Sequence, residues 1–243
     1  AQKLPLAEAL GGTRRPLPTY NSLGLYSDKT VIQACEETLA QGFAGMKIKT
    51  GWPTFSEDLA AVRAAKKRLG DKVALMIDFN QSLTRAEALA RCRGLDDEGV
   101  VWFEEPIAAD DHEGCAQIAA EVKTPVMIGE NFQGPHDMAN ALRAKAADFV
   151  MPDAQQIQGV SGWLEAAALA NEAGIPMSSH LFVEASAHLL CATPTAHWLE
   201  YMDWASQLLQ QPYRLDNGMI CAPNRPGLGL DWDEEKIKHF RLT

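Results

Sequence analysis

The sequence has little of what marks nucleic-acid-binding or membrane proteins. Acidic residues outnumber basic ones by 32 to 22, giving a net charge of −10, which disfavours nucleic acid and anionic lipid as partners. No apolar run reaches the roughly 18 residues that a membrane span needs. The chain does not open with the charged and then apolar pattern of a signal peptide. We therefore expect a cytoplasmic protein with no nucleic-acid and no membrane partner.

Cysteine is also scarce. The five cysteines are scattered and form no Cys-X-X-Cys pair. An odd, dispersed set disfavours both a disulfide framework and a zinc–thiolate site, and fits a reducing compartment. We expect small buried hydrophobic residues at these positions, which are Cys35, Cys92, Cys115, Cys191 and Cys221.

What the sequence does contain is a regular alternation of short apolar runs and amphipathic segments. Strands are predicted at residues 16–22, 44–50, 73–80, 100–105, 125–130, 148–153, 176–180 and 197–201. Helices are predicted between them at 28–41, 55–69, 84–95, 114–122, 135–144, 159–173 and 183–191, with Asp28 as a candidate cap of the first. Unbroken alternation with short connections predicts an α/β fold, a (β/α)7β-type TIM barrel.

The two ends of the chain depart from this alternation. We expect residues 1–212 to form the barrel and residues 213–243 to form an irregular segment with a short helix near 233–240. That segment would pack on the barrel or on a domain outside this chain. The chain starts without methionine, and a helical stretch at 4–10 resembles the tail of a longer helix. We therefore expect a fragment, or a protein whose N-terminal domain is missing.

The strand at 44–50 carries two lysines on one face. Side chains alternate along a strand, so Lys47 and Lys49 point the same way, into a barrel or cleft. Repulsion and burial would lower the pKa of each, and a lysine poised near neutral pH can act as a general base. Two solvated lysines on an edge strand are the alternative for this motif taken alone.

Acidic residues recur at the ends of successive strands. Asp78, Glu104 and Glu130 are spaced 26 residues apart, about one barrel unit, which places them together at the carboxyl ends of the strands. Three neighbouring carboxylates need a cation, and oxygen-only ligands favour Mg²⁺, with Mn²⁺ as an alternative. The adjacent Glu105 is expected to face away and to play a supporting or structural role.

The last strands end in three more ionisable groups. Asp153 and His180 end neighbouring strands, and an aspartate beside a histidine fixes its tautomer and raises its basicity. Glu200 ends the final strand and could hydrogen-bond a substrate oxygen, more effectively when protonated. A divalent cation between a lysine and a His–Asp pair suits abstraction of a proton α to a carboxylate. Bases on both faces would permit racemisation.

These residues resemble the mandelate racemase branch of the enolase superfamily. The resemblance lies in the Lys-X-Lys strand and in the stretches MIDFNQS, WFEEP, IGEN, MPDAQQ, SSH and HWLE. It implies a Mg²⁺-dependent racemase of a mandelate-like α-hydroxy acid, with an N-terminal capping domain over the substrate. We also expect a homo-oligomer.

The resemblance also implies individual roles. Lys49 would be the base for the (S)-enantiomer, and His180 with Asp153 would serve the (R)-enantiomer. The implied metal ligands are Asp78, Glu104 and Glu130. Substrate contacts would come from Lys47 and Ser22 to the carboxylate, from Glu200 as electrophilic donor, and from Asn80 to the α-hydroxyl.

Three alternatives stay open. The first is a sugar-acid dehydratase on the same scaffold, a lyase in which the histidine expels a β-hydroxyl. A pocket mouth with Tyr20, Leu181, Met202 and Trp204 favours a flatter, apolar substituent instead. The second is a Schiff-base aldolase, which needs one desolvated lysine and no acidic triad. The third is a binding subunit without activity.

Overall fold

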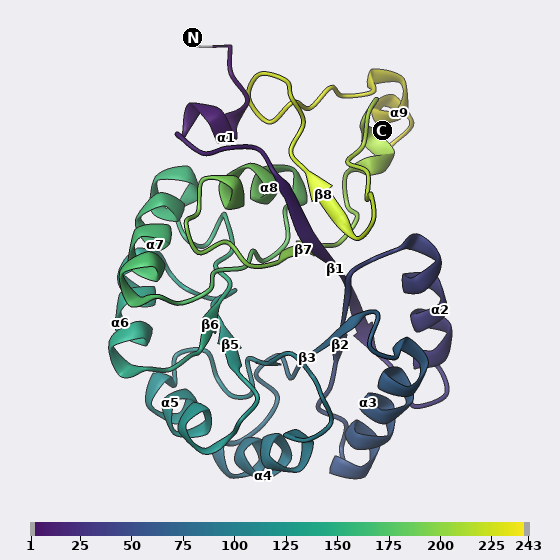
Figure 1. Cartoon of the computed structure of the whole chain (residues 1–243), viewed down its shortest axis with the longest axis vertical. Helices are drawn as coiled ribbons and strands as arrows, with labels where there is room; N and C mark the ends of the chain where they lie inside the picture. Colours follow the sequence, from purple (N-terminus) through teal and green to yellow (C-terminus); the bar gives the residue numbers. More distant parts are fainter. Residues whose placement is uncertain (1–2, 241–243) are drawn as a thin grey trace.

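Parallel strands form a ring, and helices surround it (Figure 1). The computed structural model describes residues 3–240. Its sheet has the order β6-β5-β4-β3-β2-β1-β7, and every neighbouring pair in that order is parallel. The strands are β1 (Pro16–Leu25), β2 (Gly45–Lys49), β3 (Ala74–Asp78), β4 (Phe103–Glu104), β5 (Val126–Ile128), β6 (Phe149–Val150), β7 (Leu199–Tyr201) and β8 (Met219–Cys221).

The strand predicted at residues 176–180 is present only as isolated bridges. Met177 pairs with Val150 on one side and with Ala196 on the other. The amide of Ser178 donates to the carbonyl of Val150 at 2.8 Å. Pro176 has no N–H to donate, and the pairing does not extend into a regular ladder. The segment nevertheless lies between β6 and β7 and closes the ring, which confirms the predicted barrel.

The helices follow the predicted order. They are α1 (Leu6–Ala9), α2 (Val31–Gln41), α3 (Phe55–Leu69), α4 (Arg85–Leu95), α5 (His112–Glu121), α6 (Pro135–Ala144), α7 (Gly159–Ala173), α8 (Val183–Cys191) and α9 (Glu234–His239). Capping boxes at Thr54 and Thr84 define the starts of α3 and α4. The cap predicted at Asp28 is wrong, because Ser27 and Thr30 hydrogen-bond each other and α2 begins after Thr30.

Apolar side chains pack on both faces of the barrel wall. One core lies between the strands and the helices, and a second fills the inside of the barrel. We call this second set the inner layer, and its buried members are Tyr20, Met76, Trp102, Met127 and Met151. Residues i and i+2 of a strand share a face, so the inner layer lies directly beneath Asp78, Glu104 and Asp153.

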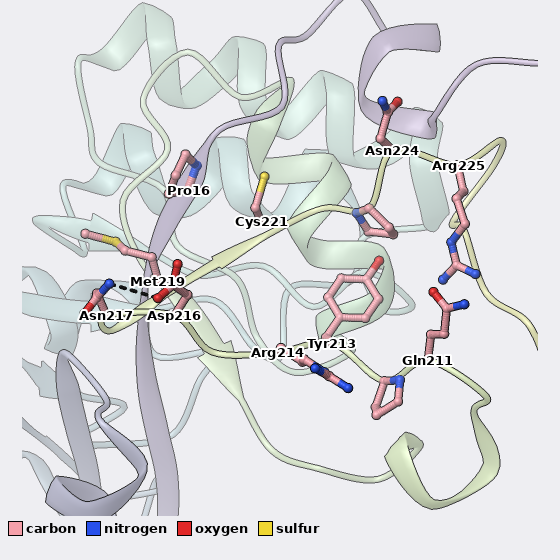
Figure 2. A pocket seen from close by; sticks show the side chains of 12 residues that line it. Pro16, Gln211, Tyr213, Arg214, Asp216, Asn217, Met219, Cys221, Asn224 and Arg225 are labelled. Atoms are coloured by element: carbon pink, nitrogen blue, oxygen red, sulfur yellow. Dashed lines mark hydrogen bonds between the residues drawn. The ribbon is translucent and has the colours of Figure 1, made fainter.

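Part of the segment between residues 213 and 240 packs beside the first strand. β8 pairs antiparallel with the start of β1, a strand that the sequence did not predict. A cavity of about 830 Å³ opens there, with Tyr213, Arg214 and Cys221 among its lining residues (Figure 2). Cys221 is exposed, contrary to expectation, and the other four cysteines are buried as expected. The boundary at residue 212 stays a prediction. Between residues 3 and 240, no helix is long and apolar enough to cross a bilayer.

Candidate active site

The carboxyl ends of the strands bring the predicted ionisable residues together. In the sheet register Lys49 of β2 lies beside Asp78 of β3, and Asp78 lies beside Glu104 of β4. Asp153 and His180 form a bridge at the same end of the barrel. The cavity near Cys221 borders Pro16, at the opposite end of β1, and is therefore separate from this site.

Three carboxylates converge at the centre of the site. Asp78, Glu104 and Glu130 each offer an oxygen, and these oxygens lie within 4.8 Å of one another. Burial, together with neighbouring carboxylates, raises the pKa of both Glu104 and Glu130. Three buried or half-buried carboxylates at this spacing repel one another, and a hard divalent cation with oxygen ligands relieves that repulsion. The donor set therefore fits Mg²⁺.

Lys47 lies within this acidic cluster. Its side chain is 3% exposed, and its ammonium contacts Glu104 and lies 2.9 Å from Oε1 of Glu200. Burial by itself would lower the pKa of Lys47, but the carboxylates of Glu104 and Glu200 hold it well above its ordinary value. The expected lowering of this pKa is therefore wrong, because the charges that surround the ammonium are negative. The surrounding carboxylates therefore favour the charged form of Lys47.

Lys49 is the more accessible lysine. Its side chain is 38% exposed, and its Nζ lies 3.6 Å from Oδ2 of Asp78. The ammonium also donates to Oδ1 of Asn80 at 2.8 Å, while Nδ2 of Asn80 donates to Oε1 of Glu130 at 3.3 Å. Asn80 thus joins the lysine to the acidic cluster. Ser22 is buried and lies opposite Lys47 in the β1–β2 register, which places it at the same level of the barrel.

His180 faces the cluster from another wall. Its Nδ1 lies 2.8 Å from Oδ2 of Asp153, and its Nε2 lies 3.4 Å from Oε2 of Glu130. Burial lowers the pKa of His180, but the hydrogen bond with Asp153 and the carboxylates of Glu200 and Glu130 raise it overall. Although burial opposes ionisation of Asp153, hydrogen bonds from the His180 ring and two backbone amides lower its pKa. The predicted His–Asp pair is thus formed.

Glu200 is held by donors on both oxygens. Oε1 faces Lys47, and Oε2 accepts from the amide of Leu181 at 2.8 Å. Burial raises the pKa of Glu200, but the charges of Lys47 and His180 and these hydrogen bonds lower it to about 2. This geometry therefore favours the ionised form of Glu200. The carboxylate accepts hydrogen bonds and donates none.

Sequence reasoning missed two supporting residues. Trp102, two residues before Glu104 on the same strand face, donates from Nε1 to Oε2 of Glu104 at 2.9 Å. Asn131 donates from Nδ2 to both oxygens of Glu105, at 3.0 and 2.9 Å. Glu105 is buried, and burial raises its pKa to about 7. The i, i+2 spacing of Trp102 and Glu104, which puts both side chains on one face of a strand, is the sequence signal that could have predicted their contact.

One residue that was expected at the mouth of the site lies elsewhere. Tyr20 is fully buried in the inner layer and does not reach the mouth, because it precedes Ser22 by two positions on β1. Trp204 is 58% exposed and meets Phe182 edge to face, with ring centroids 5.8 Å apart. Phe182 was not foreseen. Its φ of 46° belongs to the sharp turn that follows His180.

Comparison with known proteins agrees with this geometry. The model of the family described as Enolase C-terminal domain-like matches residues 30–236. A solved enolase from alphaproteobacterium bal199 with bound magnesium has a TM-score of 0.94 and 46% identity, covering 98% of this chain and 67% of that chain. A Bradyrhizobium enolase complexed with magnesium and mandelic acid has a TM-score of 0.91 and 41% identity, covering 99% of this chain and 66% of that chain.

Among curated proteins, the L-talarate/galactarate dehydratase of Salmonella typhimurium is 33% identical over 243 residues, covering 99% of this chain and 61% of its own length. The chain thus spans less than two thirds of that relative. Magnesium is bound in both of the solved relatives, and Mg²⁺ is the cofactor that the all-oxygen donor set fits. The chain belongs to the enolase superfamily, through the C-terminal domain-like family that the motifs of its strand ends had indicated.

Proposed function

We propose that this barrel removes the α-proton of an α-hydroxy carboxylate and returns it to the opposite face, as a racemase of a mandelate-like acid. The observation that carries the proposal is the placement of two proton acceptors on separate walls around one acidic triad. Lys49 reaches the triad at Asp78, and His180 reaches it at Glu130. Their segments are separated by β1 and β7 on one side and by β3 to β6 on the other.

The roles of the residues follow from their contacts. Mg²⁺ held by Asp78, Glu104 and Glu130 would neutralise charge on the substrate carboxylate. Lys47 supplies a fixed positive charge at the same place, since its ammonium already contacts two of the three carboxylates. We expect Ser22, level with Lys47, to contact the substrate carboxylate as well.

Proton transfer would fall to the two accessible bases. Lys49 would exchange the α-proton of the (S)-enantiomer and His180 that of the (R)-enantiomer, with Asp153 holding the imidazole. Asn80, within hydrogen-bond distance of Lys49, is placed to contact the α-hydroxyl. Glu200 would orient Lys47 and the turn at Leu181, and it could donate to substrate only after taking up a proton.

Hydrogen exchange tests the division between the two bases. In D₂O with Mg²⁺, the wild-type protein should incorporate deuterium at the α-carbon of both enantiomers of mandelate. His180→Asn should abolish exchange of the (R) α-proton and leave slow exchange of the (S) proton, whereas Lys49→Ala should do the reverse. Loss of both exchanges in each variant, with the fold and Mg²⁺ affinity unchanged, would contradict the proposal.

A sugar-acid dehydratase is the second candidate. It is favoured by the 33% identity to a protein named L-talarate/galactarate dehydratase. In this case one base takes the α-proton, and His180 protonates the departing β-hydroxyl. Formation of a keto acid from an aldonate or aldarate, without α-deuteration of mandelate, would reverse the ranking. The exposed Trp204 beside Phe182 favours a flatter, apolar substituent and supports the first candidate.

Two further expectations stay predictions. A homo-oligomer should show as a multiple of 26.5 kDa in light scattering. A cytoplasmic location would be read from the distribution of the protein between cell fractions.

A further inference from the structure

One side chain of the inner layer, Trp102, forms a hydrogen bond with the acidic cluster above it. Trp102 is fully buried, and its indole N–H donates to Oε2 of Glu104 at 2.9 Å. Trp102 immediately precedes β4 and Glu104 ends it, so the two side chains, two positions apart, share the inner face of the barrel. The other oxygen of Glu104, Oε1, contacts the ammonium of Lys47. The two oxygens of this carboxylate therefore have different partners.

The N–H donor fixes the plane of the Glu104 carboxylate. Turning the group out of the plane in which one of its two equivalent oxygens faces the indole would leave a buried N–H without an acceptor, which costs about 1–3 kcal/mol. Glu104 and Trp102 are both fully buried, so water cannot accept the indole N–H in place of the carboxylate. Because the indole occupies Oε2, the other oxygen, Oε1, faces the centre of the cluster, where Asp78 and Glu130 present their oxygens.

Neighbouring rings hold the indole in place. Tyr20 meets Trp102 edge to face with ring centroids 5.6 Å apart, and Phe149 does so at 6.4 Å. The ring centroid of His197 lies 6.1 Å from that of Trp102. A side chain packed on several sides gives up little additional conformational freedom when its N–H holds an acceptor. The donor is therefore rigid before any cation binds.

We propose that Trp102 is a positioning residue for the metal site. Its N–H orients Glu104 so that Oε1 faces the cation. This inference rests on the proposed ligand role of Asp78, Glu104 and Glu130. Groups that orient metal ligands typically change metal affinity by about 10- to 100-fold when they are removed.

The test measures Mg²⁺ affinity of the metal-free chain by calorimetry. Trp102→Phe removes the N–H donor and keeps an aromatic ring, so its Kd for Mg²⁺ should rise about 10-fold or more. Trp198→Phe is the matched control. Trp198 also packs on Tyr20, with centroids 6.4 Å apart, and its indole N–H makes no hydrogen bond to any residue between 3 and 240. The control should stay within about twofold of wild type, because it removes no ligand-orienting contact.

Activity gives a second comparison. If Trp102 only orients a ligand, saturating Mg²⁺ should restore kcat in Trp102→Phe, and the loss should be confined to limiting metal. A variant that binds Mg²⁺ as tightly as wild type would overturn the inference. So would an equal loss of affinity in Trp198→Phe, because the effect would then belong to barrel packing in general.

A measurement on the wild-type chain covers the case in which Trp102→Phe does not fold. The six tryptophans give separate indole N–H resonances in a ¹⁵N-labelled sample. The Trp102 resonance should shift as Mg²⁺ is added, with the Kd found by calorimetry, and the Trp198 resonance should not. The absence of any shifting indole resonance at saturating Mg²⁺ would overturn the inference. Failure of the wild type to bind Mg²⁺ would instead overturn the metal site itself.

Discussion

Asp153 and His180 meet across two neighbouring segments of the barrel, with Oδ2 of the carboxylate 2.8 Å from Nδ1 of the ring. The carboxylate also accepts the amides of Gln155 and Gln156, which hold it in place. Because the ionised carboxylate can only accept, Nδ1 carries the proton of the neutral ring. Nε2 is then the basic nitrogen, and it faces Glu130.

Replacing Asp153 with asparagine should weaken His180 as a base. The pKa of His180 should fall, because burial lowers it and the neutral asparagine would no longer raise it as the Asp153 carboxylate does. Exchange of the (R) α-proton should slow by about 10²- to 10⁴-fold. NMR titration of the ring and the D₂O assay measure the two effects. Asp97→Asn, at an exposed carboxylate, is the control and should change neither, whereas an unchanged His180 pKa in Asp153→Asn would refute this argument.

Replacing Lys47 with methionine should destabilise the chain more without metal than with it. The ammonium is the buried cation that Asp78, Glu104 and Glu200 share. Removing one partner of a buried ion pair costs about 3–5 kcal/mol of unfolding free energy. Saturating Mg²⁺ should recover part of the loss, because it supplies another positive charge. Urea unfolding in EDTA and in Mg²⁺ measures both values, and equal stability of variant and wild type in EDTA would contradict this account.

The loop after β2 depends on a second buried ion pair. Nη1 of Arg91 lies 2.5 Å from Oδ2 of Asp58, while Oδ1 of Asp58 accepts the amides of Gly51 and Trp52. Asp58→Ala should therefore lower the free energy of unfolding by about 3–5 kcal/mol. The matched control is Glu36→Ala, which breaks the exposed contact with Arg68 and should cost far less. Similar losses in both variants would show that burial does not set the cost.

Stability should fall in acid partly through His197. Burial lowers the pKa of this ring from 6.5 to about 4, so between these values the unfolded chain binds more protons than the folded one. Its contribution is complete above pH 6.5 and is lost as the pH falls towards 4. Allowing for partial exposure of the ring, the loss should be about 2 kcal/mol.

His197→Phe removes the titrating group and keeps an aromatic ring beside Phe149, where the centroids lie 4.9 Å apart. The difference in unfolding free energy between wild type and variant should therefore shrink or change sign as the pH falls from 6.5 to 4. Urea unfolding at a series of pH values measures this difference. A difference that does not vary across this range would rule out His197 as a contributor.

The sequence by itself determined the barrel and the level at which the site lies. Helical periodicity and capping residues are local, and the predicted bounds of α3, α6, α7 and α8 agree with the structure. The 26-residue spacing of Asp78, Glu104 and Glu130 reflects one strand–helix unit, so parallel order was enough to place these acids at one end of the barrel. β8 escaped prediction because it depends on pairing with the distant start of β1.

Only the tertiary structure decided the charge states and supporting contacts. Lys47 was expected to lose basicity beside Lys49, but Glu104 and Glu200, which are 57 and 153 residues away in the chain, keep it charged. The same contacts keep Glu200 ionised, and barrel closure buries Tyr20 below the mouth. A pKa depends on the charges within a few ångströms and on access to water, and strands from distant parts of the sequence supply both.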